Sequence, residues 1–174
     1  MGFDLYSQLM DEAVRELRGE PPRDDVEPEI NLPVPALLPE DYLPDVHQRL
    51  LFYKKLAQAQ SDDEVYDVRG ELRDRCGELP AEVDALSELT SLRISMRKLR
   101  LRGLETGPGR LVVTLGPTAA LEPAKLAARV QRSKGAWRLT PDMKLVSKLD
   151  GNPAGADLLE ASRKLVAEIA ACGG

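Results

Sequence analysis

The acidic residues of the segment Ser61–Cys76 are those whose type and spacing best suit chemistry or recognition. Asp67, Glu71 and Asp74 follow one another at intervals of four and three residues, so a helix would place them on one face. Arg75 stands four residues after Glu71 and can pair with it. Grouped carboxylates can perform acid–base catalysis, but only where unlike surroundings separate their pKa values. Two simpler interpretations stay open: a solvated ladder worth about 0.3–0.5 kcal/mol per pair, or a charged face that docks on a basic partner surface.

The segment around these residues carries the signals of a helix. Ser61 and Glu64 are spaced as a capping box at its start, and Gly77 follows Cys76 as a stop signal. Gly70 interrupts the helix at a cost of about 1 kcal/mol relative to alanine. The close approach of another backbone would explain why a glycine is tolerated there.

The concentrated basic residues form a second candidate site. Arg93, Arg97 and Arg100 fall on one helix face, with Lys98 and Arg102 beside them. Cations near a helix C-terminus are favourable on their own, and a solvated face is the simpler interpretation. The alternative is a nucleic-acid-binding accessory domain that uses the Arg93–Arg102 patch. The net charge of -5 argues against a general nucleic-acid binder.

Other kinds of site lack the residues they need. His47 is the one histidine, and Cys76 and Cys172 are far apart, so we expect no metal site and no Ser-His-Asp catalysis. The glycines at 107 and 109 flank a proline and lack the lysine of a phosphate-binding loop, so we expect no cofactor. No secretion signal and no apolar run of about 20 residues is visible. We therefore expect a cytoplasmic binding module without membrane contact, and not an enzyme.

Periodicity divides the chain into elements. Residues 3–18 predict an amphipathic helix, residues 20–28 a linker rich in proline and acid, and residues 29–32 a short strand. Further helices are predicted from Asp45, over 61–76 and over 81–102. In the helix that starts at Asp45, the predicted buried stripe is Val46, Leu50, Tyr53 and Ala57, widened by Phe52 and Leu56, with Gln48 as capping-box partner.

The last third of the chain is rich in strand signals. Residues 110–115 predict a strand, 123–131 a short helix, 136–146 a hairpin and 156–171 a final helix. Trp137 could stack on a base, but a hairpin tryptophan is more often part of the core. The predicted fold class is α+β, with an N-terminal helical hairpin or bundle packed on a small, mostly antiparallel sheet.

Several short motifs at fixed offsets resemble the C-terminal domain of the bacterial transcription-repair coupling factor. They are the proline-flanked run from Leu38-Pro39 to Pro44-Asp45, then Arg49-Leu50 with Tyr53-Lys54-Lys55, and Glu71-Leu72, Asp74-Arg75, Gly77 and Leu79-Pro80. The opening Gly2-Phe3-Asp4-Leu5-Tyr6 looks like the segment that follows the motor module in the same family.

This resemblance implies a regulatory role. Residues 1–19 would be a helix from the end of the motor module, with Met1 an introduced start, 20–28 a linker and 29–174 the C-terminal regulatory domain. In the family the parent is an ATP-dependent DNA translocase that displaces stalled RNA polymerase and recruits nucleotide excision repair. Its C-terminal domain docks on a UvrB-like N-terminal module and masks the surface that binds UvrA. The resemblance assigns Glu71, Asp74 and Arg75 to that contact, and Asp67 shares their face. DNA and RNA polymerase would be reached through the parent.

Overall fold

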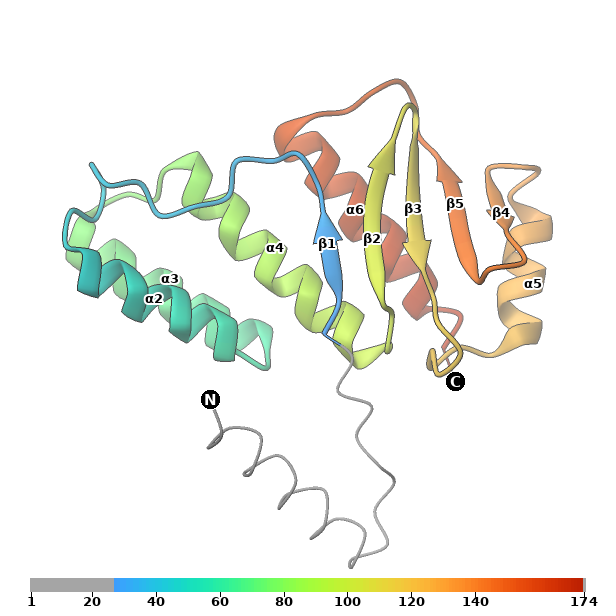
Figure 1. The fold of residues 1–174 in the computed structure, drawn as a ribbon, viewed down its shortest axis with the longest axis horizontal. Coiled ribbons are helices and arrows are strands. Elements are labelled where there is room, and N and C mark those ends of the chain that lie inside the picture. The colour runs from blue at the N-terminus through green and yellow to red at the C-terminus, as the bar shows by residue number, and fades with distance from the viewer. Residues whose placement is uncertain (1–26, 174) are drawn as a thin grey trace, which may run out of the picture.

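A computed structural model describes residues 27–173, which form a five-stranded sheet and five helices (Figure 1). The helix predicted over residues 3–18 and most of the predicted linker lie outside the described residues. In chain order the elements are β1 (Glu29–Asn31), α2 (Val46–Gln58), α3 (Asp62–Cys76), α4 (Ala81–Lys98), β2 (Gly103–Gly107), β3 (Arg110–Thr114), α5 (Pro123–Arg132), β4 (Trp137–Leu139), β5 (Lys144–Lys148) and α6 (Gly155–Ala170).

The sheet confirms the α+β prediction and its mostly antiparallel character. Its strand order is β1-β2-β3-β5-β4, and only β1 and β2 run parallel. The strand β2 was not predicted, because glycines at both of its ends mask the strand signal. The segment 107–109 forms the tight turn that joins β2 to β3 as a hairpin.

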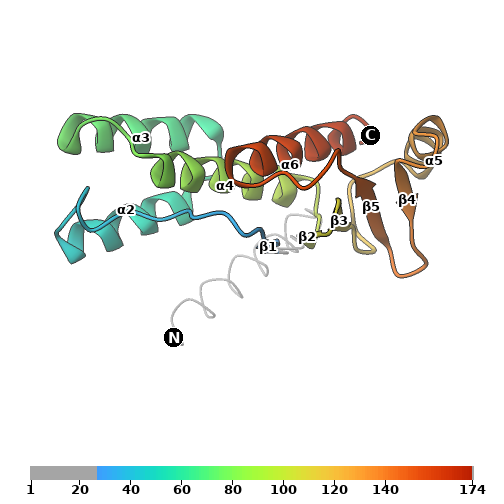
Figure 2. The ribbon, with the colours of Figure 1, turned by 90° about the horizontal axis from the view of Figure 1, so that it is seen from above.

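Helices cover only one face of the sheet. Seen from above, α4, α5 and α6 lie on the same side of the strands, and the opposite face carries no helix among the described residues (Figure 2). The core between these layers joins the sheet to α4 and α6. Its fully buried members include Met96, Leu104, Leu111, Leu145 and Ile169.

A second core lies between α2, α3 and α4. Phe52 and Leu72 are completely buried there, and Val83 and Ile94 of α4 pack against them. The helix α4 therefore contributes to both cores: Val83 and Ile94 to this one, and Met96 to the core under the sheet. Buried residues occur on nearly every side of α4, so a single apolar stripe describes it poorly.

The predicted buried stripe of α2 is wrong at Val46, Leu50 and Ala57, which are exposed, but right at Phe52 and Leu56, the residues predicted to widen it. Val46 and Leu50 are 54% and 61% exposed, whereas Phe52 and Leu56 are 0% and 3% exposed. Interactions with the proline-rich segment before α2 set this rotation. Arg49 Nη1 donates to the carbonyl oxygens of Leu43 at 2.8 Å and Pro44 at 3.0 Å.

Two other details differ from the prediction. The helix α4 ends at Lys98 and not at residue 102, because Arg100 takes a φ of 57° and redirects the chain toward β2. Asp45 caps α2 as expected, since its carboxylate accepts hydrogen bonds from the backbone N–H groups of His47 and Gln48. The side chain of Gln48, however, accepts a hydrogen bond from Arg75 of α3.

Candidate docking surface

The predicted acidic face lies on α3 beside its seam with α2. The hydroxyl oxygen of Ser61 accepts from the backbone N–H of Glu64 at the start of α3, and three acidic residues occupy the first turn. Val65, Val68 and Leu72 are buried on the inner side of the helix. Asp67, Glu71, Asp74 and Arg75 follow each other on its outer side. We call these four residues the α3 charged face.

Glu71 is the best-anchored member of the α3 charged face. Lys55 Nζ of α2 donates to both carboxylate oxygens of Glu71, at 2.9 and 3.0 Å, and an Arg75 guanidinium nitrogen lies 3.3 Å away. The hydrogen bond from Lys55 is the main reason that the pKa of the Glu71 carboxyl lies below its ordinary value, a shift that desolvation partly opposes. Glu71 therefore links α2 to α3 inside the domain.

Arg75 is also fixed by α2. One of its guanidinium nitrogens donates to Gln48 Oε1 at 3.2 Å, and the guanidinium lies 5.8 Å from the centre of the Phe52 ring. Lys55 Nζ lies 5.1 Å from the same ring centre. Sequence reasoning missed Gln48, Lys55 and Phe52 as partners of the charged face. Spacing within one helix gives no signal for contacts that join two helices.

Asp67 and Asp74 behave differently from Glu71 and Arg75. Both side chains are exposed, and within residues 27–173 neither carboxylate makes an ion pair or a hydrogen bond. The structure thus brings all four predicted residues to one side of α3, but divides them into a pair held by α2 and a pair of free carboxylates. The outer part of the α3 charged face, at Asp67 and Asp74, is accessible, whereas Glu71 and Arg75 contact α2.

Gly70 is not approached by another backbone of the described residues, so the predicted close approach stays a prediction about a partner. A side-chain β-carbon built at Gly70 would meet no heavy atom within 4 Å, so no backbone of the described chain approaches it closely. Gly70 lies on the outer side of α3, three residues from Asp67 and four from Asp74. The space above it is open, next to the free carboxylates.

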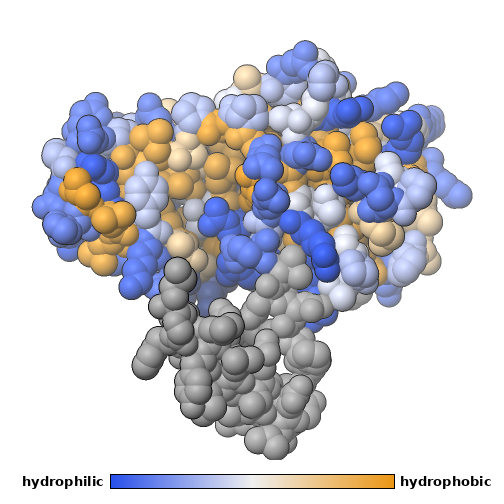
Figure 3. All heavy atoms as spheres, viewed as in Figure 1, coloured by the Kyte–Doolittle hydropathy of each residue, from blue (hydrophilic) through white to orange (hydrophobic). Residues whose placement is uncertain are grey.

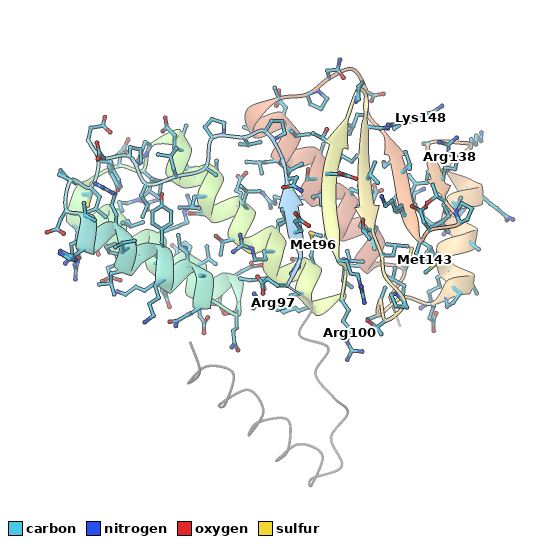
Figure 4. The ribbon with its side chains drawn as sticks, viewed as in Figure 1. Met96, Arg97, Arg100, Arg138, Met143 and Lys148 are labelled. Carbon is cyan, nitrogen blue, oxygen red and sulfur yellow. The ribbon has the colours of Figure 1, made fainter. Side chains whose placement is uncertain are left out.

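The basic patch on α4 is partly neutralised. Arg97 donates to both carboxylate oxygens of Glu27, at 2.8 and 3.0 Å, and Arg93 lies 3.8 Å from the same carboxylate. Arg100 is exposed just beyond the end of α4 and lies near Arg97 (Figure 4). Two of the three arginines predicted as a nucleic-acid contact therefore already hold an anion of this chain.

The remaining sequence-based candidates have structural explanations. Trp137 is 4% exposed and belongs to the core, as predicted, with the Arg129 guanidinium 4.4 Å from its ring centre. His47 is exposed at the start of α2. Across residues 27–173, no cluster of metal-binding side chains occurs. None of the helices found there is long and apolar enough to cross a membrane.

An open groove of about 1030 Å³ lies between α3, α4 and α6. Tyr66, Ser91 and Arg163 are among its lining residues, so it lies away from the Glu71 contact with α2. The carboxyl pKa of Glu71 is lowered, whereas a general acid working near neutral pH needs a raised one. The acid–base interpretation of the α3 charged face therefore gains no support.

Comparison with known proteins gives a consistent set of relatives. The family model described as "TRCF domain" matches residues 32–126. The transcription-repair-coupling factor of Myxococcus xanthus is 56% identical over 172 residues, which cover 99% of this chain and 14% of that protein. The corresponding factor of Escherichia coli strain K12 is 35% identical over 144 residues, which cover 80% of this chain and 12% of that protein. This chain thus spans about one-seventh of the length of these relatives.

A solved structure supports the same comparison at the level of fold. The crystal structure of the C-terminal domain of a transcription-repair coupling factor superposes with a TM-score of 0.72. The match covers 84% of this chain and 94% of that chain at 20% sequence identity. At this identity the match establishes the α+β fold alone.

Proposed function

This chain belongs to the transcription-repair coupling factor family, and from that premise we propose that residues 29–174 act as an autoinhibitory docking domain. The α3 charged face would bind the UvrB-like N-terminal module of the parent protein and mask the surface of that module that binds UvrA. The domain would act by binding, in the cytoplasm, while ATP-driven translocation, DNA contact and RNA polymerase displacement belong to other parts of the parent. Residues 20–28 would link this domain to a helix of the motor module at residues 1–19.

The proposal rests on one observation: two residues of the α3 charged face are held by α2, and the other two make no ion pair or hydrogen bond among the described residues. Arg75 and Glu71 are held in place by α2, so they lose little conformational freedom when a partner binds. Asp67 and Asp74 are free to receive basic groups of that partner. Such complementarity mainly sets the register and specificity of docking.

The surroundings of the face also suit a protein partner. Leu51 of α2 is 43% exposed, and it lies three residues after Gln48 and four before Lys55, on the side of α2 that meets α3. The open space above Gly70 would admit a partner backbone next to Asp74. The surface thus combines an exposed apolar side chain at Leu51, the charges of Glu71 and Arg75 held by α2, and open space at Gly70.

Autoinhibition requires a contact that can be released. A coupling free energy of about 1–3 kcal/mol between closure and UvrA binding would change UvrA affinity by roughly 5- to 150-fold. A much stronger contact would hold the parent closed permanently.

The test uses the full-length parent carrying Asp67→Ala and Asp74→Ala together. Neither carboxylate has a partner in the described domain, so the thermal stability of the domain should stay unchanged while UvrA binding increases. The matched control is Glu160→Ala, which removes an exposed carboxylate from α6. Unchanged UvrA binding in a pull-down with the double variant, alongside the control, would refute docking through this face.

A further inference from the structure

The uncovered face of the sheet carries a second group of charges, far from α2 and α3. Residues directly opposite each other on paired strands share a face. Arg110 of β3 is opposite Lys148 of β5, and Arg138 of β4 is opposite Val146 of β5. Val146 and Lys148 are two residues apart and therefore point the same way. All three cations consequently lie on the face that no described helix covers.

These cations have no ion-pair partner in the part of the chain that the structure describes. Arg110, Arg138 and Lys148 are exposed, and across residues 27–173 none of them is in an ion pair. Figure 4 shows Arg138 and Lys148 together at the β4–β5 end of the domain, well separated from Arg97 and Arg100. Like charges directly opposite each other, as in Arg110 and Lys148, destabilise a sheet. An anion bound between them would remove that repulsion.

The face is also hollowed at this point. A depression of about 370 Å³ is lined by the three cations and by apolar side chains, among them Pro108, Val146 and Leu149. The side chain of Arg110 leans over Gly107, where a β-carbon would come within 2.8 Å of its Nε. The absence of a side chain at Gly107 thus leaves room for the position of the Arg110 guanidinium beside the depression.

The mixture of charge and apolar surface favours a protein segment over nucleic acid. Val112 and Val146 are half-buried neighbours in the centre of this face, and apolar and charged residues are interleaved across the view in Figure 3. The aromatic ring of Trp137 lies in the core, where it cannot stack on a base.

We propose that the uncovered sheet face binds an acidic protein segment. Its carboxylates would pair with Arg110, Arg138 and Lys148, and an apolar side chain would enter the depression beside Val146. This site is separate from the α3 charged face, so it does not depend on the autoinhibitory proposal. It gives the domain a second contact at its opposite end.

The experiment measures fluorescence anisotropy of a labelled acidic peptide, in which glutamates flank a central leucine, titrated with the chain at low salt. Binding is expected, with lower affinity at high salt. Arg138→Glu combined with Lys148→Glu should weaken binding by about tenfold or more, since two charge-assisted contacts become repulsive. Arg138→Gln combined with Lys148→Gln provides a milder pair should the charge reversals impair folding. The control is Lys164→Glu on α6, which makes one such charge reversal on the other side of the molecule.

Three results would overturn the proposal. One is equal affinity of the double variants and the wild type. Another is equal binding of a peptide with glutamine in place of every glutamate, since the cations would then play no part. The third is tighter binding of a labelled DNA oligonucleotide than of the acidic peptide, which would assign the face to nucleic acid.

Discussion

The ion pair between Lys55 and Glu71 gives the sharpest test of how α2 and α3 are joined. Replacing Glu71 by glutamine keeps the shape of the side chain but removes its charge, and Lys55→Met keeps most of the lysine stem over the Phe52 ring. Each replacement should destabilise the domain. The double variant should be less destabilised than the sum of the two, because both remove the same interaction.

The expected coupling free energy follows from geometry and exposure. Both carboxylate oxygens of Glu71 contact Lys55 Nζ within 3.0 Å, which is good geometry. The two side chains are still 34% and 36% exposed, so solvent screens the pair. We therefore expect a coupling of about 0.5–1 kcal/mol, at the upper end of the range for exposed pairs. A loss of that size should lower the melting temperature of a protein of this length by about 1–4 °C in each single replacement.

The assay is urea unfolding of the four proteins of the double-mutant cycle, at low and at high salt. The coupling should shrink at high salt. Lys54→Met is the control, since Lys54 is exposed and makes no ion pair within residues 27–173. A coupling of zero at low salt would show that the pair does not hold α2 on α3, and Glu71 would then be free to serve a partner.

The same pair predicts a dependence on pH. The pKa of Glu71 is lowered in the folded state, so the unfolded chain binds the extra proton as the pH falls. The stabilising contribution of Glu71 is complete above the ordinary glutamate pKa and is lost as the pH falls through the lowered one. The difference in unfolding free energy between wild type and Glu71→Gln should therefore shrink below about pH 4.

Two further predictions concern packing and backbone. Phe52→Ala should lower the free energy of unfolding in urea by about 3–5 kcal/mol, because the ring is completely buried. Leu50→Ala, on the exposed side of α2, should change it by less than about 0.5 kcal/mol, and similar losses in the two variants would contradict the observed rotation of α2. Gly70→Ala should raise the melting temperature, since the mid-helix site is open and alanine stabilises a helix by up to about 1 kcal/mol relative to glycine. Gly77→Ala should lower the melting temperature, because the φ of 90° at Gly77 strains any other residue by about 1–3 kcal/mol. The opposite order of melting temperatures would refute this reasoning.

Local signals in the sequence predict most elements of this fold. Asp45 and Ser61 cap α2 and α3 as their side-chain chemistry suggests, and Gly77 ends α3 with a positive φ. The strands β3 and β5 follow from their β-branched residues. Such features depend on neighbours within a few residues, which a sequence displays directly.

The rotation of α2 depended on contacts that the sequence does not display. Apolar residues occur around most of this helix, so two different stripes fit its periodicity equally well. Hydrogen bonds between distant residues choose between them: Arg49 binds the carbonyls before α2, and the Tyr53 hydroxyl accepts from the backbone N–H of Leu38 at 2.8 Å. The same limit explains why Glu71 and Arg75 could be placed on one face of α3, but their partners on α2 could not be named.

The position of α4 in both cores has a mechanical consequence. A force applied to α2 and α3 reaches the sheet through one continuous helix, so the two cores should move together as one rigid body. Glu27 is clasped by Arg93 and Arg97 of that helix, at the point where the preceding chain joins the domain. Tension applied through Glu27 would thus act first on α4, through Arg93 and Arg97, before it acts on either core.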